Sequence, residues 1–571
     1  MPEIDLRQKF LSFFEAKGHK RVPSSSLVPT DPSVLLTTAG MQQFKPYYTE
    51  PEAAWAEFGG VNVASVQKCF RTTDIDEVGD KSHLTFFEML GNFSFGGYSK
   101  AEAIKLAHEF ITQELGLEIS YVSIFGGQGE LLRDGKSAEI WNSLGNFEIR
   151  ELGLEDVFWG PTGAAGPCGP TTEIYCKNQV GEDVEIWNIV FNEFYFPDSR
   201  EALLSGKGLE RLEKLSNLGI DTGMGLERLA MIVEKKEDIF DTSLLFPLVE
   251  AINCHSTKSN PRSVRIMADH LRASIFLLVD GVRPSNTDRG YILRRLIRRL
   301  IRHRQAIGLS FGLGELARLI IREYGRSYPQ LEQASVSVVE SLNQESDKFQ
   351  LTLDRGLKEF ARGTDPFTLF TTYGFPVELT EELAREEGRE IDRRSFDEAL
   401  RKHQEVSRVG SEKKFVGGLA DTEPATINLH TAHHLLLAAL KQVLKQNIKQ
   451  RGSNINQERL RLDFTFDRKL TEEEKQQVEE LVNEKIAKDL KVVCREMPFG
   501  EAEKLGAEME FGAKYGDTVS VYFIEDAKGE VFSKEFCGGP HAASTGKLGH
   551  FKIKKEESAA SGIRRLKAVL E

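Results

Sequence analysis

The sequence predicts an α+β protein built from several domains. Its 571 residues are too many for a single hydrophobic core. Short β-like runs between glycine-rich turns dominate the N-terminal part, amphipathic helical patterns the middle, and alternating helical and strand patterns the C-terminal part. We therefore expect domains at residues 1–242, 243–410 and 425–571, with a turn-forming linker at residues 411–424.

The composition argues against a secreted or membrane protein. The chain begins Met-Pro-Glu-Ile-Asp-Leu-Arg, with charges where a signal peptide needs an apolar run. The most apolar stretch, residues 275–279, is far too short to span a bilayer. Six cysteines in so long a chain do not form a disulfide framework. We expect a cytoplasmic protein with no membrane partner.

The N-terminal part contains a predicted nucleotide site. Helical periodicity covers residues 6–16 and 100–115, and a strand, a polar loop and an antiparallel strand are predicted across residues 69–92. Arg71 falls on the first of these strands and Phe87 on the second. The pair suits an adenine nucleotide, because a guanidinium binds phosphate and an aromatic ring covers the base.

The segment Asp-Thr-Gly-Met-Gly-Leu-Glu-Arg at residues 221–228 is predicted to join a strand to a helix. Gly223 and Gly225 would let the backbone approach a ligand closely. Asp221 can bind an ammonium group, and Arg228 can bind phosphate through its planar fork. A G-x-G pattern alone is also typical of an ordinary tight turn. Together with the predicted nucleotide site, the segment indicates amino-acid activation.

The middle of the chain is predicted to be mostly helical, with amphipathic stretches at residues 264–279, 291–306 and 333–361. The second stretch has apolar residues on one helical face and arginines on the other. The arginines are Arg294, Arg295, Arg298, Arg299, Arg302 and Arg304. A net charge of −13 argues against a polyanionic partner, but a face of one sign within an acidic chain predicts one. The alternative is the solvated face of a packed helix.

Two pairs of metal-binding residues occur in the C-terminal part. A helix is predicted at residues 430–449, and His430 and His434 share one face because they are four positions apart. Cys537 and His541 have the same spacing in a glycine-flanked turn. The remaining predicted elements are a helix at residues 471–489 and strands near residues 460–466, 492, 518–523 and 551. Three imidazoles and a thiolate form a tetrahedral Zn²⁺ ligand set, so a zinc site is predicted.

Several long strings resemble the class II aminoacyl-tRNA synthetases, and in particular the alanyl-tRNA synthetase family. They are SSSLVP, TFFEMLGNFSFG, EIWNIVF, DTGMGLER, and DGVRPSN followed by RGYILRR. The resemblance runs through nearly the whole chain. It implies an antiparallel-sheet catalytic domain, a helical tRNA-binding domain and a zinc-binding α+β editing domain. It also implies a ligase whose partners are ATP, L-alanine and tRNA(Ala).

The resemblance assigns the ATP contacts. Arg71 would contact the α-phosphate, Phe87 would stack on adenine, and Arg228 would hold the far side of ATP, with Mg²⁺ assisting. One departure is that much of the family carries a lysine in a longer loop after the motif arginine. This chain has no lysine there before Lys81, and the resemblance leaves open whether Lys81 replaces it.

The resemblance also assigns the amino-acid contacts. Asp221 would bind the α-ammonium group, helped by Asn188. Trp187 would either wall the side-chain pocket or pack in the core, two alternatives that the sequence does not separate. Alanine, glycine and serine share the ammonium group, and a pocket sized for alanine excludes the other two poorly. A second, hydrolytic site would therefore raise fidelity.

In the middle domain, the resemblance concerns tRNA. Asn286 matches an asparagine that reads a G·U pair in the acceptor stem, although it could also be a turn residue after Pro284. Thr371 stands where relatives have an aspartate, so we expect weaker discrimination at that pair. The resemblance places Arg294, Arg295, Arg298 and Arg299 on the tRNA-facing helix.

In the C-terminal domain, His430, His434, Cys537 and His541 resemble the zinc set of the editing domain of alanyl- and threonyl-tRNA synthetases. Gln450 matches an editing-pocket residue. His433 stands where relatives usually have threonine, which makes serine selectivity less secure; it could compete as a metal ligand, although neighbouring helical residues point about 100° apart.

Relatives insert a β-barrel before the HxxxH helix and continue into a C-terminal oligomerising domain. Only residues 372–429 separate Thr371 from His430. The resemblance is therefore to a reduced synthetase lacking both parts, which we expect to be monomeric. Two other functions stay open: a stand-alone hydrolase of mischarged tRNA with a decayed synthetase body, and a non-catalytic amino-acid-binding paralogue.

Overall fold

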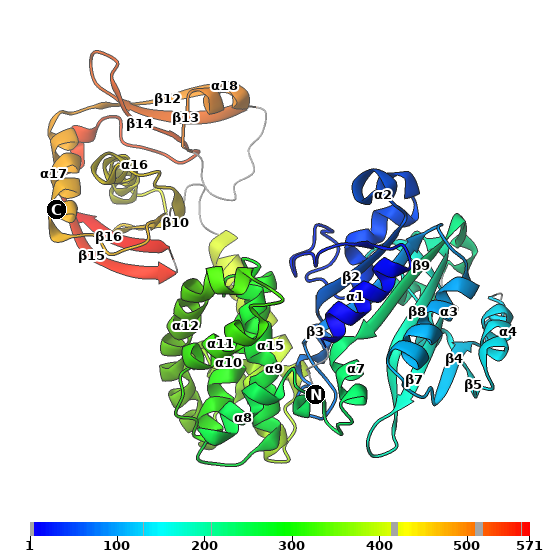
Figure 1. The fold of residues 1–571 in the computed structure, drawn as a ribbon. Coiled ribbons are helices and arrows are strands. Elements are labelled where there is room, and N and C mark those ends of the chain that lie inside the picture. The colour runs from blue at the N-terminus through cyan, green and yellow to red at the C-terminus, as the bar shows by residue number, and fades with distance from the viewer. Residues whose placement is uncertain are drawn as a thin grey trace. The chain divides into compact units, whose positions relative to one another are not determined.

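The computed structural model describes residues 5–129, 131–206, 208–412, 419, 421–508, 518–560 and 562–571. The chain forms two compact units, Met1–Ile391 and Asp392–Glu571 (Figure 1). Each unit has its own principal core of buried side chains. Among the described residues, no helix is both long and apolar enough to cross a membrane.

A mostly antiparallel sheet forms the frame of the first unit. Its strands run in the order β1-β2-β3-β9-β8-β7-β4-β5, with β6 paired to β7; β1–β2 and β4–β5 are parallel pairs. The strands are β1 (Lys20–Arg21), β2 (Asn62–Phe70), β3 (Phe86–Phe95), β4 (Tyr121–Phe125), β5 (Ile149–Leu152), β6 (Phe158–Trp159), β7 (Gly166–Lys177), β8 (Asp183–Phe196) and β9 (Glu213–Gly225). The antiparallel-sheet fold is therefore confirmed.

Short helices accompany this sheet. They are α1 (Leu6–Ala16), α2 (Pro51–Phe58), α3 (Lys100–Glu109), α4 (Gly135–Leu144), α5 (Leu154–Val157), α6 (Arg200–Leu204) and α7 (Leu226–Val233). Helix α1 has the predicted bounds, because the side chain of Asp5 caps its first turn and its apolar face, including Phe10 and Phe14, is buried. The second predicted helix ends at Glu109 and continues as a π-helical turn, Phe110–Glu114.

The register of the sheet brings distant residues onto one face. Glu173 on β7 lies opposite Asn188 on β8, and Asn188 lies opposite Gly223 on β9. Val190, two residues after Asn188, lies opposite Asp221. Residues directly opposite each other on neighbouring strands share a face. Glu173, Asn188 and Asp221 therefore project from the same side of the sheet.

The helical part of the first unit packs against this sheet. Its helices are α8 (Phe246–Cys254), α9 (Pro261–Val279), α10 (Asp288–Ile307), α11 (Leu313–Tyr324), α12 (Gln330–Ala361), α13 (Pro366–Tyr373) and α14 (Val377–Glu386). The three helices predicted in this part of the chain correspond to α9, α10 and α12, and each begins three residues before its predicted start. Phe276 on α9 stacks on Phe86 of β3, with ring centroids 4.4 Å apart. Sheet and helices share one core, and the unit continues to Ile391.

The second unit is built around α16 (Pro424–Leu444), which contacts both of its sheets. One sheet has the order β10 (Gln450–Ile455), β11 (Leu460–Thr465), β16 (Ile563–Leu570), β15 (Phe551–Ala560). The other has the order β12 (Lys491–Pro498), β13 (Thr518–Glu525), β14 (Val531–Phe536). The further helices are α15 (Arg393–Glu412), α17 (Glu472–Ala487) and α18 (Phe499–Lys504).

The predicted helix at residues 430–449 is placed too late. Pro424 starts α16 at a position where its missing N–H costs nothing, and Lys445 ends the helix in a left-handed conformation. Most of the predicted linker, residues 413–418 and 420, lies outside the described residues. Of the described residues between Thr371 and His430, those in regular structure belong to helices, and Leu419 forms an isolated bridge to Ile455.

Candidate functional site

A pocket opens on the face of the first sheet where the predicted activation residues lie. Its lining includes Arg71, Phe87, Asn188, Asp221 and Arg228. These residues come from the end of β2, from β3, β8 and β9, and from the first turn of α7. The structure thus brings together all of the predicted ATP and ammonium contacts, while Trp187, a candidate for the side-chain pocket, is not among the lining residues.

Arg71 and Phe87 form the nucleotide side of this pocket. The guanidinium carbon of Arg71 lies 5.0 Å from the centre of the Phe87 ring, and both side chains are half-buried. The backbone N–H of Arg71 donates to the carbonyl of Thr85 at 2.9 Å, which ties the residue to the neighbouring strand. Lys81 instead pairs with Glu237 and is not among the residues lining the pocket.

Asp221 supplies a buried carboxylate to the pocket. Its side chain is enclosed by the sheet, and this burial raises its pKa to about 7. A carboxylate in such a place is costly to ionise without a cation beside it. The site is therefore suited to a ligand that brings a positive charge.

Glu173 is a pocket residue that sequence reasoning missed. Its Oε1 accepts a hydrogen bond from Nδ2 of Asn188 at 3.0 Å. Burial, and then the charge of Glu185, raise its pKa to about 7. The available signal was a lone carboxylate in the run that became β7, where Lys177 at the end is the only other charged residue, but only the register with β8 shows that Glu173 holds Asn188.

Trp187 packs in the core, the second of its two predicted alternatives, and does not line the pocket. Successive residues of a strand point to opposite faces, so Trp187 turns away from the face that Asn188 occupies. It is fully buried and packs edge-on against Phe10, Phe14 and Phe110, with ring centroids 5.8–6.3 Å away. The tryptophan that lines the pocket is Trp159.

Arg228 lies at the pocket rim. Its Nη1 donates to a carboxylate oxygen of Glu185 at 3.1 Å and to the carbonyl of the same residue at 3.3 Å. The predicted junction is confirmed, since β9 ends at Gly225 and α7 begins at Leu226. An added Cβ at Gly223 would lie 2.8 Å from Sδ of Met89, so a larger residue there would require the Met89 side chain to move.

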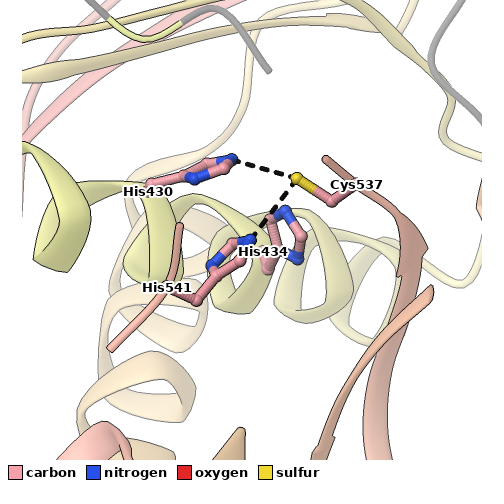
Figure 2. A group of neighbouring side chains, drawn as sticks. All are labelled: His430, His434, Cys537 and His541. Carbon is pink, nitrogen blue, oxygen red and sulfur yellow. Dashed lines mark hydrogen bonds between the residues drawn. The ribbon is translucent and has the colours of Figure 1, made fainter. Parts of the chain in front are cut away.

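The second unit brings together the four predicted metal ligands. The ligand atoms of His430, His434, Cys537 and His541 all lie within 4.8 Å of one another. Sγ of Cys537 is 3.4 Å from Nε2 of His430 and 3.4 Å from Nε2 of His541. Figure 2 shows the three rings and the thiol around one common space. This is the donor set and the spatial grouping that a tetrahedral zinc site needs.

Outer contacts orient these rings. Nδ1 of His430 is 3.0 Å from the carbonyl of Pro540, and Nδ1 of His541 is 3.2 Å from Oγ1 of Thr431. Such contacts fix which nitrogen faces a metal. Burial lowers the pKa of His430 to about 4, which keeps its imidazole neutral, as metal binding requires. Nδ1 of His434 is buried without a hydrogen-bond partner in the described structure.

His433 and Glu535 lie beside this cluster. The ligand atoms of these two residues and of His434 lie within 4.8 Å of one another. Oε2 of Glu535 is 3.7 Å from Nε2 of His434, and burial raises the pKa of Glu535 to about 8. His433 is outside the four-residue set. Gln450 is half-buried at the start of β10.

Comparison with known proteins identifies the family. Residues 5–451 match the model of tRNA synthetases class II (A), and residues 519–567 match the threonyl and alanyl tRNA synthetase second additional domain. The alanine–tRNA ligase of Treponema pallidum (strain Nichols) is 44% identical over 610 residues, covering 99% of this chain and 98% of the relative. That of Borrelia hermsii (strain HS1 / DAH) is 42% identical, with coverage of 99% of each.

The chain belongs to the alanine–tRNA ligase family. A more distant relative, the alanine–tRNA ligase of Dehalococcoides mccartyi (strain CBDB1), is 35% identical over 99% of this chain and 79% of its own length.

In this member of the alanine–tRNA ligase family, the arginine-rich helix is enclosed on both sides. The predicted apolar residues Leu293, Leu296, Ile297, Leu300 and Ile301 are all buried. Arg299 corrects the prediction of a tRNA contact, because it is 3% exposed and forms an ion pair with Glu382 at 3.1 Å. Burial is the reason that this side chain cannot reach a polyanion.

The other three arginines are half-buried and also have partners. Arg294 and Arg298 lie 3.2 and 3.5 Å from Glu345, and Arg295 lies 2.7 Å from Asp76. Each of the four arginines, Arg299 included, thus forms an ion pair with a carboxylate of the same unit. This arrangement is nearer to the alternative prediction, in which the helix is packed within the protein. These three arginines keep part of their surface accessible and can still contribute to a phosphate contact.

Asn286 and Thr371 are both exposed. The side-chain oxygen of Asn286 accepts a hydrogen bond from Arg294, which anchors the loop before α10. Thr371 donates to the carbonyl of Phe367 at 2.8 Å on α13. The hydroxyl of Thr371 is thus engaged by its own helix, which is a weaker starting point for base recognition than a free carboxylate.

Proposed function

We propose that this protein is an alanine–tRNA ligase that forms alanyl-adenylate from alanine and ATP and then transfers alanine to the 3′ end of tRNA(Ala). The observation that carries the proposal is the single pocket that joins Arg71 and Phe87 to Asp221 and Asn188. One half suits an adenine nucleotide and the other suits the ammonium group of an amino acid. The family relationship points to alanine.

In the first step, a carboxylate oxygen of alanine attacks the α-phosphorus of ATP. A phosphorus–oxygen bond forms, the bond to the bridging oxygen breaks, and pyrophosphate leaves with its electron pair. The carboxylate is already a nucleophile, so no general base is needed. Catalysis then depends on position and on stabilising charge at phosphorus. Arg71 is placed to supply that charge, and Phe87 holds the base.

Asp221 and Asn188 orient the amino acid, and Arg228 binds the far phosphates once it exchanges Glu185 for ATP. Bound with ATP, Mg²⁺ would neutralise charge on the leaving pyrophosphate. In the second step a terminal hydroxyl of tRNA attacks the carbonyl carbon of the adenylate and AMP leaves. The phosphate group of the adenylate lies next to this hydroxyl and can accept its proton.

For the second unit we propose hydrolysis of tRNA(Ala) mischarged with serine or glycine. His430, His434, Cys537 and His541 would hold Zn²⁺, and the fit rests on their grouped ligand atoms and on the unpartnered nitrogen of His434. Zinc would supply Lewis-acid polarisation or anchor the end of the tRNA. Gln450 would face the substrate. A hydrolytic site of this kind would remove serine that the activation pocket fails to reject.

For tRNA binding we propose Asn286 as the acceptor-stem contact, supported by Arg294, Arg295 and Arg298. Asn286 is exposed in the loop just before α10 and accepts a hydrogen bond from Arg294. We further propose domains at residues 1–242, 243–410 and 425–571, a monomeric state and a cytoplasmic location. None of the six cysteines forms a disulfide in the described structure, which agrees with a reducing compartment.

The proposal is tested by ATP–pyrophosphate exchange with alanine, glycine and serine, followed by deacylation of Ser-tRNA(Ala). Exchange that depends strongly on alanine supports the ligase. Deacylation without exchange would identify a stand-alone hydrolase, and binding of alanine without either activity would identify a non-catalytic paralogue. In either of the last two cases the ligase proposal fails.

A further inference from the structure

Glu173 holds Asn188 in one orientation. The side chain of Glu173 is 6% exposed and its two carboxylate oxygens are both occupied. Oε1 accepts from Nδ2 of Asn188 at 3.0 Å, and Oε2 accepts from Oγ of Ser123 at 2.8 Å and from the hydroxyl of Tyr175 at 2.9 Å. The three donors come from three neighbouring strands, β8, β4 and β7.

This contact determines which way the amide of Asn188 points. An ionised carboxylate accepts hydrogen bonds and cannot donate them. If the amide were rotated, its oxygen would face the oxygen of Glu173 and a buried repulsion would result. With Nδ2 fixed on Glu173, Oδ1 is directed away from it. Oδ1 is buried without a hydrogen-bond partner in the described structure, although Asn188 lines the pocket.

An oxygen in this position needs a donor, because an unpaired buried acceptor is costly. Asp221 projects from the same face of the sheet, two residues before Gly223, which lies opposite Asn188. A substrate ammonium group has three N–H donors, so it can be shared between the carboxylate of Asp221 and the amide oxygen of Asn188.

We propose that Glu173 is a positioning residue that sets the amide of Asn188 with its oxygen toward the ammonium group of the amino-acid substrate. The inference rests on the proposed function. Glu173 acts through Asn188, while Asp221 supplies the charge. Ser123 and Tyr175 keep Glu173 from turning toward the ligand itself.

Further contacts support the rigidity of this arrangement. Oγ1 of Thr172 donates to the carbonyl of Ser123 at 2.7 Å, and Nε1 of Trp141 donates to Oγ1 of Thr172 at 2.8 Å. These groups are buried, so the strand that carries Ser123 is fixed against β7. A positioning residue needs such support, because small displacements of the groups that hold a substrate are costly to the reaction.

The inference is tested by a double-mutant cycle with Glu173→Ala and Asn188→Ala, read as the KM for alanine and the KM for ATP in pyrophosphate exchange. Each single change should raise the KM for alanine by about tenfold, the scale of one hydrogen bond to a charged group, and leave the KM for ATP unchanged. The double variant should be no worse than Asn188→Ala. Additive effects would overturn the inference.

Conservative variants distinguish position from charge. In Glu173→Gln, the amide oxygen can still accept from Asn188 while the NH₂ group donates to the hydroxyls of Ser123 and Tyr175, which can reverse their roles. The KM for alanine should therefore stay within about threefold of the wild-type value. A rise as large as that of Glu173→Ala would show that the charge binds the ammonium group directly, which overturns the inference.

A reciprocal exchange covers the case in which Glu173→Ala does not fold. Asn188→Asp places two acceptors face to face and should impair alanine binding. Adding Glu173→Gln supplies a donor to the new carboxylate and should restore the KM for alanine at least partly. Absence of any rescue in a folded double variant overturns the inference. If the wild-type protein showed no alanine-dependent exchange, the proposed function itself would fail, which is a separate outcome.

The ammonium group is common to alanine, glycine and serine. A residue that acts only on this group should change the KM of all three amino acids by the same factor. Unequal changes after Glu173→Ala would place the residue beside the substrate side chain and contradict the assigned role.

Discussion

Arg299 and Glu382 form a buried ion pair, with Nη2 of the arginine 3.1 Å from Oε1 of the glutamate. The pair joins α10 to α14, and Nε2 of His303 lies 3.1 Å from the same oxygen. Burial opposes ionisation of Glu382, but the hydrogen bond with His303 and the charges of Arg299 and Arg302 hold its pKa well below its usual range. The arginine-rich helix thus has a structural role within its own unit.

We expect Arg299→Ala to destabilise the first unit by about 3–5 kcal/mol, because it leaves the carboxylate of Glu382 buried with fewer cations. Thermal unfolding would show the loss. Asn286→Ala is the matched comparison, since Asn286 is exposed. It should leave the melting temperature and pyrophosphate exchange unchanged and lower the rate of tRNA charging. An Asn286→Ala protein that charges tRNA normally would contradict the acceptor-stem assignment.

Arg71→Ala should lower alanine-dependent pyrophosphate exchange by about 10²–10³-fold, the usual effect of removing one group that stabilises transition-state charge. Arg71→Lys should recover only part of the rate, because lysine keeps the charge but loses the planar fork. Both proteins should fold, since Arg71 is half-buried at the pocket.

Arg211→Ala is the control for these variants. Arg211 also lies over a phenylalanine, with its guanidinium carbon 5.5 Å from the Phe196 ring centre, but it pairs with Asp198 and is not among the pocket residues. Its replacement should leave exchange unchanged. Equal losses in Arg71→Ala and Arg211→Ala would mean that Arg71 has no specific role.

The sequence was sufficient where neighbouring positions decide the structure. Periodicity placed α1 correctly, and spacings of four brought His430 to His434 and Cys537 to His541. The local pattern predicted one antiparallel strand pair, across residues 69–92, and the rest of the antiparallel sheet was implied by the resemblance.

The sequence was insufficient where register or a distant partner decides. The face on which Trp187 lies depends on the pairing of β8 with β7 and β9, where a one-residue shift exchanges the two faces. Glu173 gains its meaning from Asn188, which is 15 residues away on the next strand. Arg299 is buried by Glu382, which is 83 residues away. Helical periodicity cannot reveal such a partner.

Asp221→Asn should make the protein more stable and unable to bind alanine well. The pKa of Asp221 is about 7 in the folded protein and near 3.9 in an unfolded chain. The folded state therefore holds a proton that the unfolded state has lost, and stability falls as pH rises from about 4 to about 7. The variant avoids this cost. Its free energy of unfolding should exceed that of the wild-type protein by up to about 4 kcal/mol at pH 8 and by little at pH 4.

Urea unfolding of wild-type protein and Asp221→Asn across this pH range measures the difference. Asp198→Asn is the control, because hydrogen bonds from Arg211 and Ser199 lower the pKa of Asp198 instead of raising it. It should show no gain with rising pH. A difference between wild-type and Asp221→Asn that does not depend on pH would mean that Asp221 ionises normally in the folded protein.

The same raised pKa predicts the pH dependence of alanine binding. The ammonium group binds the ionised form of Asp221, so the KM for alanine should fall as pH rises through about 7. Glu173 also has a pKa of about 7, but its protonated form still offers an oxygen to the amide of Asn188, so its ionisation should add little. A KM for alanine that rises between pH 6 and pH 8 would contradict the assignment of Asp221.

Cys537→Ala should lower the zinc content of the purified protein and abolish deacylation of Ser-tRNA(Ala), while pyrophosphate exchange continues. The two units have separate principal cores, so loss of a ligand in the second should not reach the pocket of the first. Cys494→Ala is the matched control, because Cys494 is exposed on β12 of the same unit. It should keep both the metal and the hydrolase activity.

The role of Glu535 gives a finer test of the same site. Its carboxylate lies 3.7 Å from Nε2 of His434, and outer groups of this kind commonly change metal affinity by about 10–100-fold. Competition with a chelator should show that Glu535→Gln weakens zinc binding by less than Cys537→Ala does, because all four ligands remain. If Glu535→Gln bound zinc as tightly as the wild-type protein, the carboxylate would have no part in orienting His434. If Cys537→Ala kept its full metal content, the four-residue set would not be the zinc site.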